Sequence, residues 1–109
     1  MFPFGRKPDL TNFSPTALHE ALTAGRVTLV DVREPGEHAA ARIDGAINHP
    51  LSNFNPASLP AGAVVLHCGV GKRSAMAAER CAQAGVKVAG HLDGGLAAWS
   101  DAGLPVTRG

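Results

Sequence analysis

The chain has little of several things that would mark a specialised class of protein. It contains two cysteines, one tryptophan and no tyrosine in 109 residues. A small secreted domain held together by disulfides would need more cysteines. The formal net charge is only +1, which argues against general electrostatic binding to nucleic acid or to an acidic membrane.

Long apolar runs are missing as well. No run approaches the roughly 20 apolar residues that span a bilayer, and the N-terminus has no apolar stretch long enough for a secretory signal. We therefore expect a soluble, cytoplasmic protein without nucleic-acid or membrane partners, in which Cys68 and Cys81 are free thiols.

What is present suits one packed domain. Hydrophobic residues make up 45% of the chain and charged residues 17%, a composition too apolar for a disordered chain. Residues 1–9 hold two prolines, a glycine and two basic residues. We expect these residues to form a loose arm, and residues 10–109 to form a single domain.

Apolar runs and helical patterns alternate along the domain. Strands are expected at 27–32, 46–48, 63–67 and 86–91, and helices at 14–24, 34–41, 74–84 and 95–102. This alternation predicts an α/β fold with a central, mostly parallel sheet covered by helices on both faces. Sites in such sheets lie just beyond the carboxyl ends of the strands.

The most informative segment, 64–75, has such an end. A strand stops at residue 67, a tight glycine-containing turn begins with Cys68, and Ser74 opens a helix. A curled turn before a helix points several amide N–H groups inward and forms an anion nest. Those dipoles, together with Lys72 and Arg73, favour the thiolate of Cys68 over the thiol.

Four ordered segments, 29–34, 42–48, 68–73 and 92–99, resemble the signatures of the rhodanese-like sulfurtransferases. The resemblance implies that family's fold over nearly the whole chain after the arm. It also implies that Cys68 attacks a small anionic sulfur donor such as thiosulfate, becomes a persulfide, and passes the sulfur to a thiol, a protein acceptor or cyanide. No metal or organic cofactor is implied.

The candidate site residues follow from the loop and the resemblance together. Cys68 is the expected nucleophile. The expected substrate-binding cradle is Gly69, Val70, Gly71, Lys72 and Arg73. Support for the loop is expected from Asp31, Arg33 and Ser74, with Asp31 and Arg33 forming an ion pair beneath it.

Two features bear on the reaction class. Arg73 follows Cys68 by five positions, as in the sulfur-transferring branch, whereas related phosphatases have six. The His67-Cys68 pair nevertheless resembles the start of a phosphatase loop, so a phosphatase or arsenate reductase stays as an alternative. Another is a persulfide carrier or regulatory binding module. Two features bear on the choice of donor. The glycine next to the cysteine, Gly69, resembles the loop of the mercaptopyruvate-using relatives, whereas the cations Lys72 and Arg73 favour the dianion thiosulfate.

Other residues have structural interpretations. Cys81 and Trp99 are expected in the core, and Gly94 and Gly95 are expected to let the chain pass close to the cysteine loop.

The three histidines at strand ends, His49, His67 and His91, are expected to be hydrogen-bonded side chains rather than metal ligands. Arg42 stands where the family usually has histidine. It either adds a cation near the pocket or pairs with a surface acid.

Overall fold

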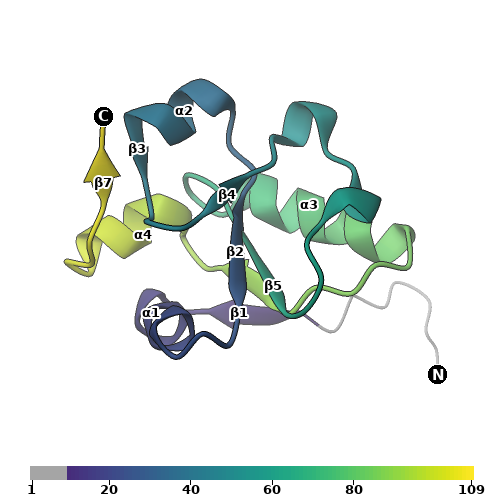
Figure 1. Ribbon diagram of the computed structural model, residues 1–109, viewed down its shortest axis with the longest axis horizontal. Coiled ribbons are helices and arrows are strands. Elements are labelled where there is room, and N and C mark those ends of the chain that lie inside the picture. The colour runs from purple at the N-terminus through teal and green to yellow at the C-terminus, as the bar shows by residue number, and fades with distance from the viewer. Residues whose placement is uncertain (1–9) are drawn as a thin grey trace.

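The computed structural model describes residues 10–109, and the expected arm at 1–9 lies outside the described residues. The main sheet has five parallel strands in the order β1-β6-β5-β2-β4 (Figure 1). They are β1 (Thr11–Phe13), β2 (Thr28–Asp31), β4 (Ile47–Asn48), β5 (Val64–His67) and β6 (Gly90–Leu92). A separate antiparallel pair joins β3 (Ala41–Arg42) to β7 (Thr107–Arg108).

Four α-helices and two short 3-10 helices are found in residues 10–109. The α-helices are α1 (Pro15–Thr23), α2 (Pro35–Ala40), α3 (Lys72–Gln83) and α4 (Gly95–Asp101), and the 3-10 helices are η1 (Leu51–Asn53) and η2 (Pro56–Ser58). No helix in this part of the chain is long and apolar enough to cross a membrane.

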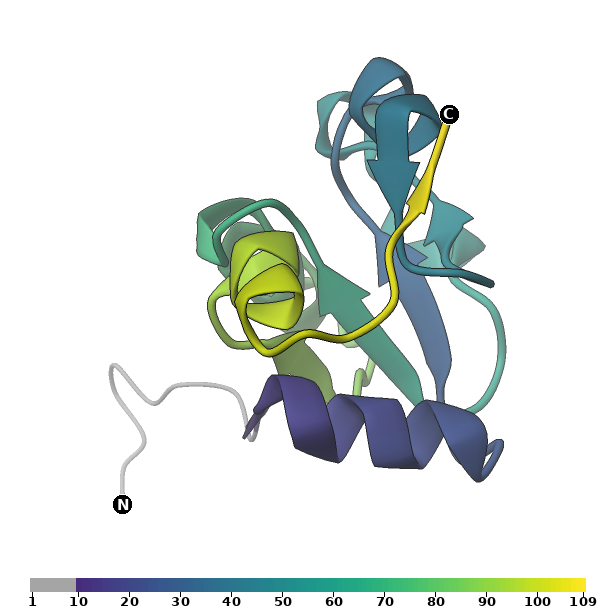
Figure 2. The same cartoon turned by 90° about the vertical axis from the view of Figure 1, so that its left-hand side faces the viewer.

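The sheet is covered on both faces because its central strands alternate their apolar side chains between two cores. On one face, Val30 and Leu66 pack with Cys81 of α3. On the other, Leu29 packs in a cluster with Leu18 of α1 and Trp99 of α4. Figure 2 shows α1 and α4 in front of the sheet on this face. The expected α/β fold with a parallel central sheet is confirmed, as are the core positions of Cys81 and Trp99, which are at most 2% exposed.

Helix α1 begins where the sequence predicts. The Ser14 hydroxyl accepts a hydrogen bond from the amide of Ala17 at 3.1 Å, and Pro15 occupies the first turn. This side-chain cap satisfies one of the amides that a helix start leaves free.

Two predicted boundaries are wrong. The strand expected at 86–91 is β6 at Gly90–Leu92 instead, because the Val86 amide bonds to the Cys81 carbonyl at 2.8 Å and closes the end of α3. Helix α3 begins at Lys72, not at Ser74. Gly71, with a φ of 103°, precedes the first helical residue and turns the chain into the helix two residues earlier than predicted.

Three strands were not expected from the sequence. They are β1, β3 and β7, none longer than three residues, and β1 is an exposed edge strand. Such short polar segments carry no period-two apolar pattern. Strand β1 runs beside β6 and brings Asn12 next to His91.

Candidate active site

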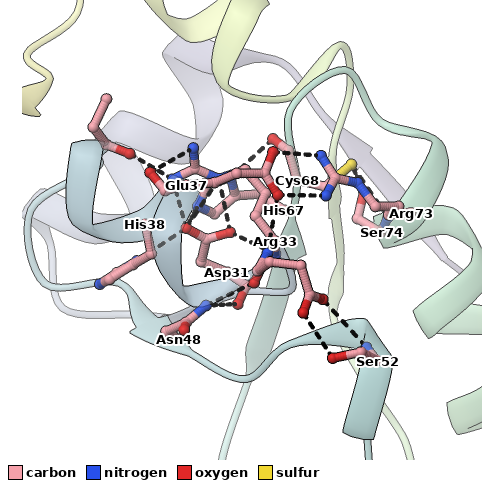
Figure 3. Close-up of polar contacts among 12 residues, drawn as sticks. Asp31, Arg33, Glu37, His38, Asn48, Ser52, His67, Cys68, Arg73 and Ser74 are labelled. Atoms are coloured by element: carbon pink, nitrogen blue, oxygen red, sulfur yellow. Dashed lines mark hydrogen bonds and ion pairs between the residues drawn. The ribbon is translucent and has the colours of Figure 1, made fainter.

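Cys68 lies at the carboxyl end of the central strand β5, at the start of the loop that leads into α3 (Figure 3). Strands β2 and β6 flank β5 and are parallel to it, so three strand ends converge on this position. The Cys68 side chain is 0% exposed. The residues around Cys68 therefore cover its sulfur completely.

Backbone amides surround the sulfur of Cys68. The Gly71 amide donates to Sγ at 3.1 Å and the Ser74 amide donates at 3.3 Å. Sγ thus accepts from the third residue of α3, the bond that a side-chain oxygen makes at an ordinary helix start. Burial by itself would raise the pKa of the Cys68 thiol, but hydrogen bonds from Ser74, Gly71 and Val70 outweigh it and lower that pKa.

The start of α4 holds the loop from the other side. The amide of Leu96 donates to the Cys68 carbonyl at 2.9 Å, and that of Ala97 donates to the Gly69 carbonyl at 3.0 Å. These two carbonyls therefore face α4 rather than the sulfur. A Cβ on Gly95, whose φ is 63°, would lie only 2.5 Å from the Gly69 carbonyl carbon. The expected close passage of Gly95 is confirmed.

The two cations of the loop differ in their surroundings. Arg73 forms a two-pronged ion pair with Glu37 of α2, at 2.7 and 3.0 Å, which lowers the pKa of Glu37. Lys72 is exposed. Glu37 was not predicted as part of the site, because its partner lies 36 residues away and no local pattern connects the two residues.

Asp31 and Arg33 form the expected ion pair at the end of β2. The Arg33 guanidinium contacts both oxygens of Asp31, the nearer at 2.7 Å, and also donates to the Ala41 carbonyl at 2.6 Å. His38 Nδ1 lies 3.0 Å from the same carboxylate. Burial would raise the pKa of Asp31, but these partners lower it. The pair therefore ties β2 to α2 and β3.

His67 connects this ion pair to the loop. Its ring is completely buried, and its Nδ1 donates to the Cys68 carbonyl at 3.1 Å. Its Nε2 has no hydrogen-bond partner among the described residues and lies 3.6 Å from the Asp31 carboxylate. Burial lowers the pKa of His67. The ring therefore braces the loop backbone and faces away from the thiol, as the alternation of strand side chains predicts.

The Ser74 side chain links the sulfur of Cys68 to His91. Its hydroxyl oxygen lies 3.6 Å from Cys68 Sγ and 2.9 Å from His91 Nδ1. His91 Nε2 in turn lies 3.0 Å from the side-chain oxygen of Asn12. Ser74 was predicted to support the loop, but its contact with His91 was not predicted. Asn12 was not predicted as a neighbour of His91, because β1 was not expected.

The remaining histidines and Arg42 have local partners. His49 Nε2 accepts from the Asn55 amide at 3.1 Å, and residues 10–109 contain no group of three His, Cys, Asp or Glu side chains that could hold a metal ion. Arg42 donates to the Ala39 carbonyl at 3.2 Å, at the end of α2.

Known proteins are similar to this chain in sequence and in fold. Residues 14–102 match the family model of the rhodanese-like domain. The chain is 41% identical over 98 residues to the uncharacterized protein slr1261 of Synechocystis, which covers 87% of this chain and 55% of that protein. It is 40% identical over 96 residues to a probable adenylyltransferase/sulfurtransferase, MoeZ, of Mycobacterium tuberculosis, covering 83% of this chain and 24% of that one.

A relative of similar size is a sulfurtransferase of Allochromatium vinosum. It is 36% identical over 83 residues, covering 73% of this chain and 78% of that protein. The chain thus spans from about a quarter to about four fifths of the length of these curated relatives.

Solved structures agree. A rhodanese-related protein of Thermoplasma volcanium superposes with a TM-score of 0.78 at 30% identity, covering 88% of this chain and 96% of that one. A Rhodopseudomonas palustris protein described as a possible tyrosine phosphatase superposes with a TM-score of 0.77 at 26% identity, covering 90% and 85%. With its cysteine loop between β5 and α3 and a family match over most of its length, the chain belongs to the rhodanese-like domain family.

Proposed function

We propose that this protein is a sulfurtransferase that moves a sulfane sulfur from a thiosulfate-type donor through a persulfide on Cys68. The observation that carries the proposal is the pair of amides, from Gly71 and Ser74, that donate to Sγ. They favour the thiolate, which is the nucleophilic form of cysteine. The family and its sulfurtransferase-named relatives support sulfur transfer in general.

The reaction has two displacement steps. In the first, the Cys68 thiolate attacks the outer sulfur of thiosulfate, the sulfur–sulfur bond of the donor breaks, and sulfite leaves with the bonding electron pair. In the second, a thiol, a protein acceptor or cyanide attacks the terminal sulfur of the persulfide and Cys68 leaves as the thiolate. The loop amides, among them those of Gly71 and Ser74 that donate to Sγ, hold the negative charge in both steps.

The donor is assigned to the thiosulfate type because cations lie at the loop. Lys72 is exposed and can meet a dianion at the loop mouth. Arg73 shares its charge with Glu37, so we assign the larger attraction to Lys72. The thiolate needs a reducing compartment, which agrees with a cytoplasmic location.

The experiment is an intact-mass measurement before and after incubation with thiosulfate. The wild-type protein is expected to gain one sulfur atom and to lose it again when cyanide is added. The Cys68→Ser variant is expected to gain none. The matched control is Cys81→Ala, which removes the other buried thiol and is expected to load sulfur like the wild type.

Equal sulfur loading by Cys68→Ser would overturn the assignment of the nucleophile. No loading of a reduced wild-type protein would overturn thiosulfate as donor, and mercaptopyruvate would be tested next. Loading without turnover on small acceptors would favour the persulfide carrier. Cys68-dependent hydrolysis of a phosphate ester would favour the phosphatase.

A further inference from the structure

A chain of polar side chains leads from the candidate nucleophile to the edge of the sheet. Cys68 Sγ lies 3.6 Å from Ser74 Oγ, which lies 2.9 Å from His91 Nδ1, and His91 Nε2 lies 3.0 Å from Asn12 Oδ1. Ser74 is fully buried and His91 is 8% exposed, whereas Asn12 is exposed. The chain therefore crosses from the buried sulfur through α3 and β6 to β1.

The protonation state of His91 follows from its partners. The Asn12 side-chain oxygen can only accept, so His91 Nε2 carries a proton and donates it. In the neutral ring Nδ1 is then an acceptor that faces the Ser74 hydroxyl. Burial lowers the pKa of His91, against the opposing effect of the Asp93 carboxylate, and a neutral ring is ready to take a proton.

Ser74 has one hydroxyl proton and several acceptors within reach. Its oxygen lies 3.2 Å from the Gly71 carbonyl as well as close to His91 Nδ1 and Cys68 Sγ. When the proton points to His91, the oxygen can accept the S–H of Cys68. When His91 is protonated, Nδ1 donates to the oxygen, and the hydroxyl turns to the sulfur and stabilises the thiolate.

We propose that Ser74 and His91 form a proton relay that converts the Cys68 thiol into a thiolate–imidazolium pair, with Asn12 and His91 acting as positioning residues. The Cys68 S–H bond breaks and its proton passes to Ser74 Oγ, while the hydroxyl proton of Ser74 passes to His91 Nδ1. No proton leaves the protein, and no other reactant is required. A role in turnover rests on the proposed sulfur transfer, but the relay itself does not.

The groups around the relay set the direction of its charge. Burial lowers the pKa of His91, and the Asp93 carboxylate, which follows β6, offsets part of that effect. The thiolate is attracted to the Arg73 guanidinium, which belongs to the first turn of α3. An opposite charge within about 4–6 Å of a titratable group shifts the pKa of that group by roughly one to three units. Formation of the imidazolium therefore lowers the pKa of Cys68, beyond what the loop amides achieve.

The test is the pH dependence of the thiolate absorbance in the ultraviolet, measured in a Cys81→Ala background so that only Cys68 contributes. The variant His91→Asn keeps an acceptor near Ser74 but cannot be protonated. It is expected to raise the Cys68 inflection by roughly one pH unit. If His91 only holds the Ser74 hydroxyl away from the sulfur, the inflection stays or falls, and the proposal is overturned.

The isosteric variant Asn12→Asp gives the opposite change. Its carboxylate stabilises the imidazolium of His91, so the Cys68 inflection is expected to fall. In the double variant with His91→Asn this effect is expected to vanish, because there is no ring to protonate. An equal change in both backgrounds would show that the effect of Asn12→Asp does not pass through His91, and would overturn the relay. Thermal unfolding of each variant controls for loss of the fold.

This readout separates the relay from the proposed function. Thiolate absorbance needs no sulfur donor, so a shifted inflection without sulfur loading would uphold the relay and refute the transfer. Normal sulfur loading with unchanged Cys68 inflections would uphold the transfer and refute the relay.

Discussion

The two cysteines of this chain are equally buried and chemically opposite. Cys68 and Cys81 are both 0% exposed. Cys81 lies in α3 against the sheet, and burial alone raises the pKa of its thiol. Cys68 meets the same desolvation, but amides of the loop and of the first turn of α3 donate to its sulfur, so its pKa is lowered. Inward-pointing amides, rather than exposure, distinguish the thiol whose pKa is lowered from the thiol whose pKa is raised.

Helix α3 contributes to both pKa shifts, because its first turn offers free backbone amides to Cys68 and its later turns place Cys81 among apolar side chains. At the start of α3 the backbone amides have no partner within the helix, and Cys68 supplies one. At Cys81 the amides already bond within the helix, and the thiol has only apolar neighbours in its cluster. A nucleophile at a helix start thus gains stabilisation that a mid-helix thiol cannot.

The largest expected effect comes from moving the amides away from Cys68. Gly95→Ala would place a Cβ against the Gly69 carbonyl carbon and force a positive φ on alanine. We expect a loss of roughly 3 kcal/mol or more in the free energy of unfolding, because backbone strain and overlap add. In the protein that still folds, we expect the pKa of Cys68 to rise toward that of an ordinary thiol.

Gly85→Ala is the matched control for Gly95→Ala. It has a similar φ of 74°, but its Cβ would meet nothing within 4 Å. The expected loss is about 1 kcal/mol from backbone strain alone, with the pKa of Cys68 unchanged. Denaturant unfolding and thiolate absorbance measure the two effects. Equal losses and an unmoved pKa in both variants would show that the contact between α4 and the loop does not shape the thiol.

The next largest expected effect is the difference in pKa between the two thiols. Single-cysteine variants, Cys81→Ala to observe Cys68 and Cys68→Ala to observe Cys81, are titrated by thiolate absorbance. Because the pKa of Cys68 is lowered and that of Cys81 is raised, thiolate is expected first at Cys68 as pH increases. A separation of one pH unit is about a tenfold difference in thiolate fraction. Coincident titrations would contradict the role assigned to the amides.

The smallest effects concern the cations at the loop. Lys72→Ala is expected to raise the KM for thiosulfate a few-fold, because an exposed charge attracts a dianion only modestly through water. Glu37→Gln removes the carboxylate that binds Arg73 and is expected to lower that KM. Steady-state kinetics at low salt measure both, and high salt reduces both effects. Unchanged KM values in both variants would place the donor away from these cations.

Much of the site was predictable because the information is local. The run from Val64 to Ser74 contains a buried strand, a cysteine, two glycines and a helix start in order, which is sufficient to predict an anion nest around Cys68. The pair of Asp31 and Arg33 was predictable for the same reason, since the two residues are separated by one position.

Long-range partners were not predictable in this way. Glu37 reaches Arg73 across 36 positions, and Asn12 reaches His91 across 79. No periodicity relates such pairs, and Asn12 lies on a three-residue edge strand that lacks an apolar pattern. Even the start of α3 depended on a glycine with positive φ and on a sulfur acting as the cap, which residue preferences do not describe.

The fold class, and the choice of Cys68 as the candidate nucleophile at the start of a glycine-containing loop, could be read from the amino-acid sequence. These depend on apolar periodicity and on residues that are adjacent in the chain. The amides that donate to the Cys68 sulfur, and the partners Glu37 and Asn12 of Arg73 and His91, became visible in the folded chain alone. The reason is physical: a pKa depends on the hydrogen bonds and charges that reach the group through space, and parallel strands bring those together from distant parts of the chain.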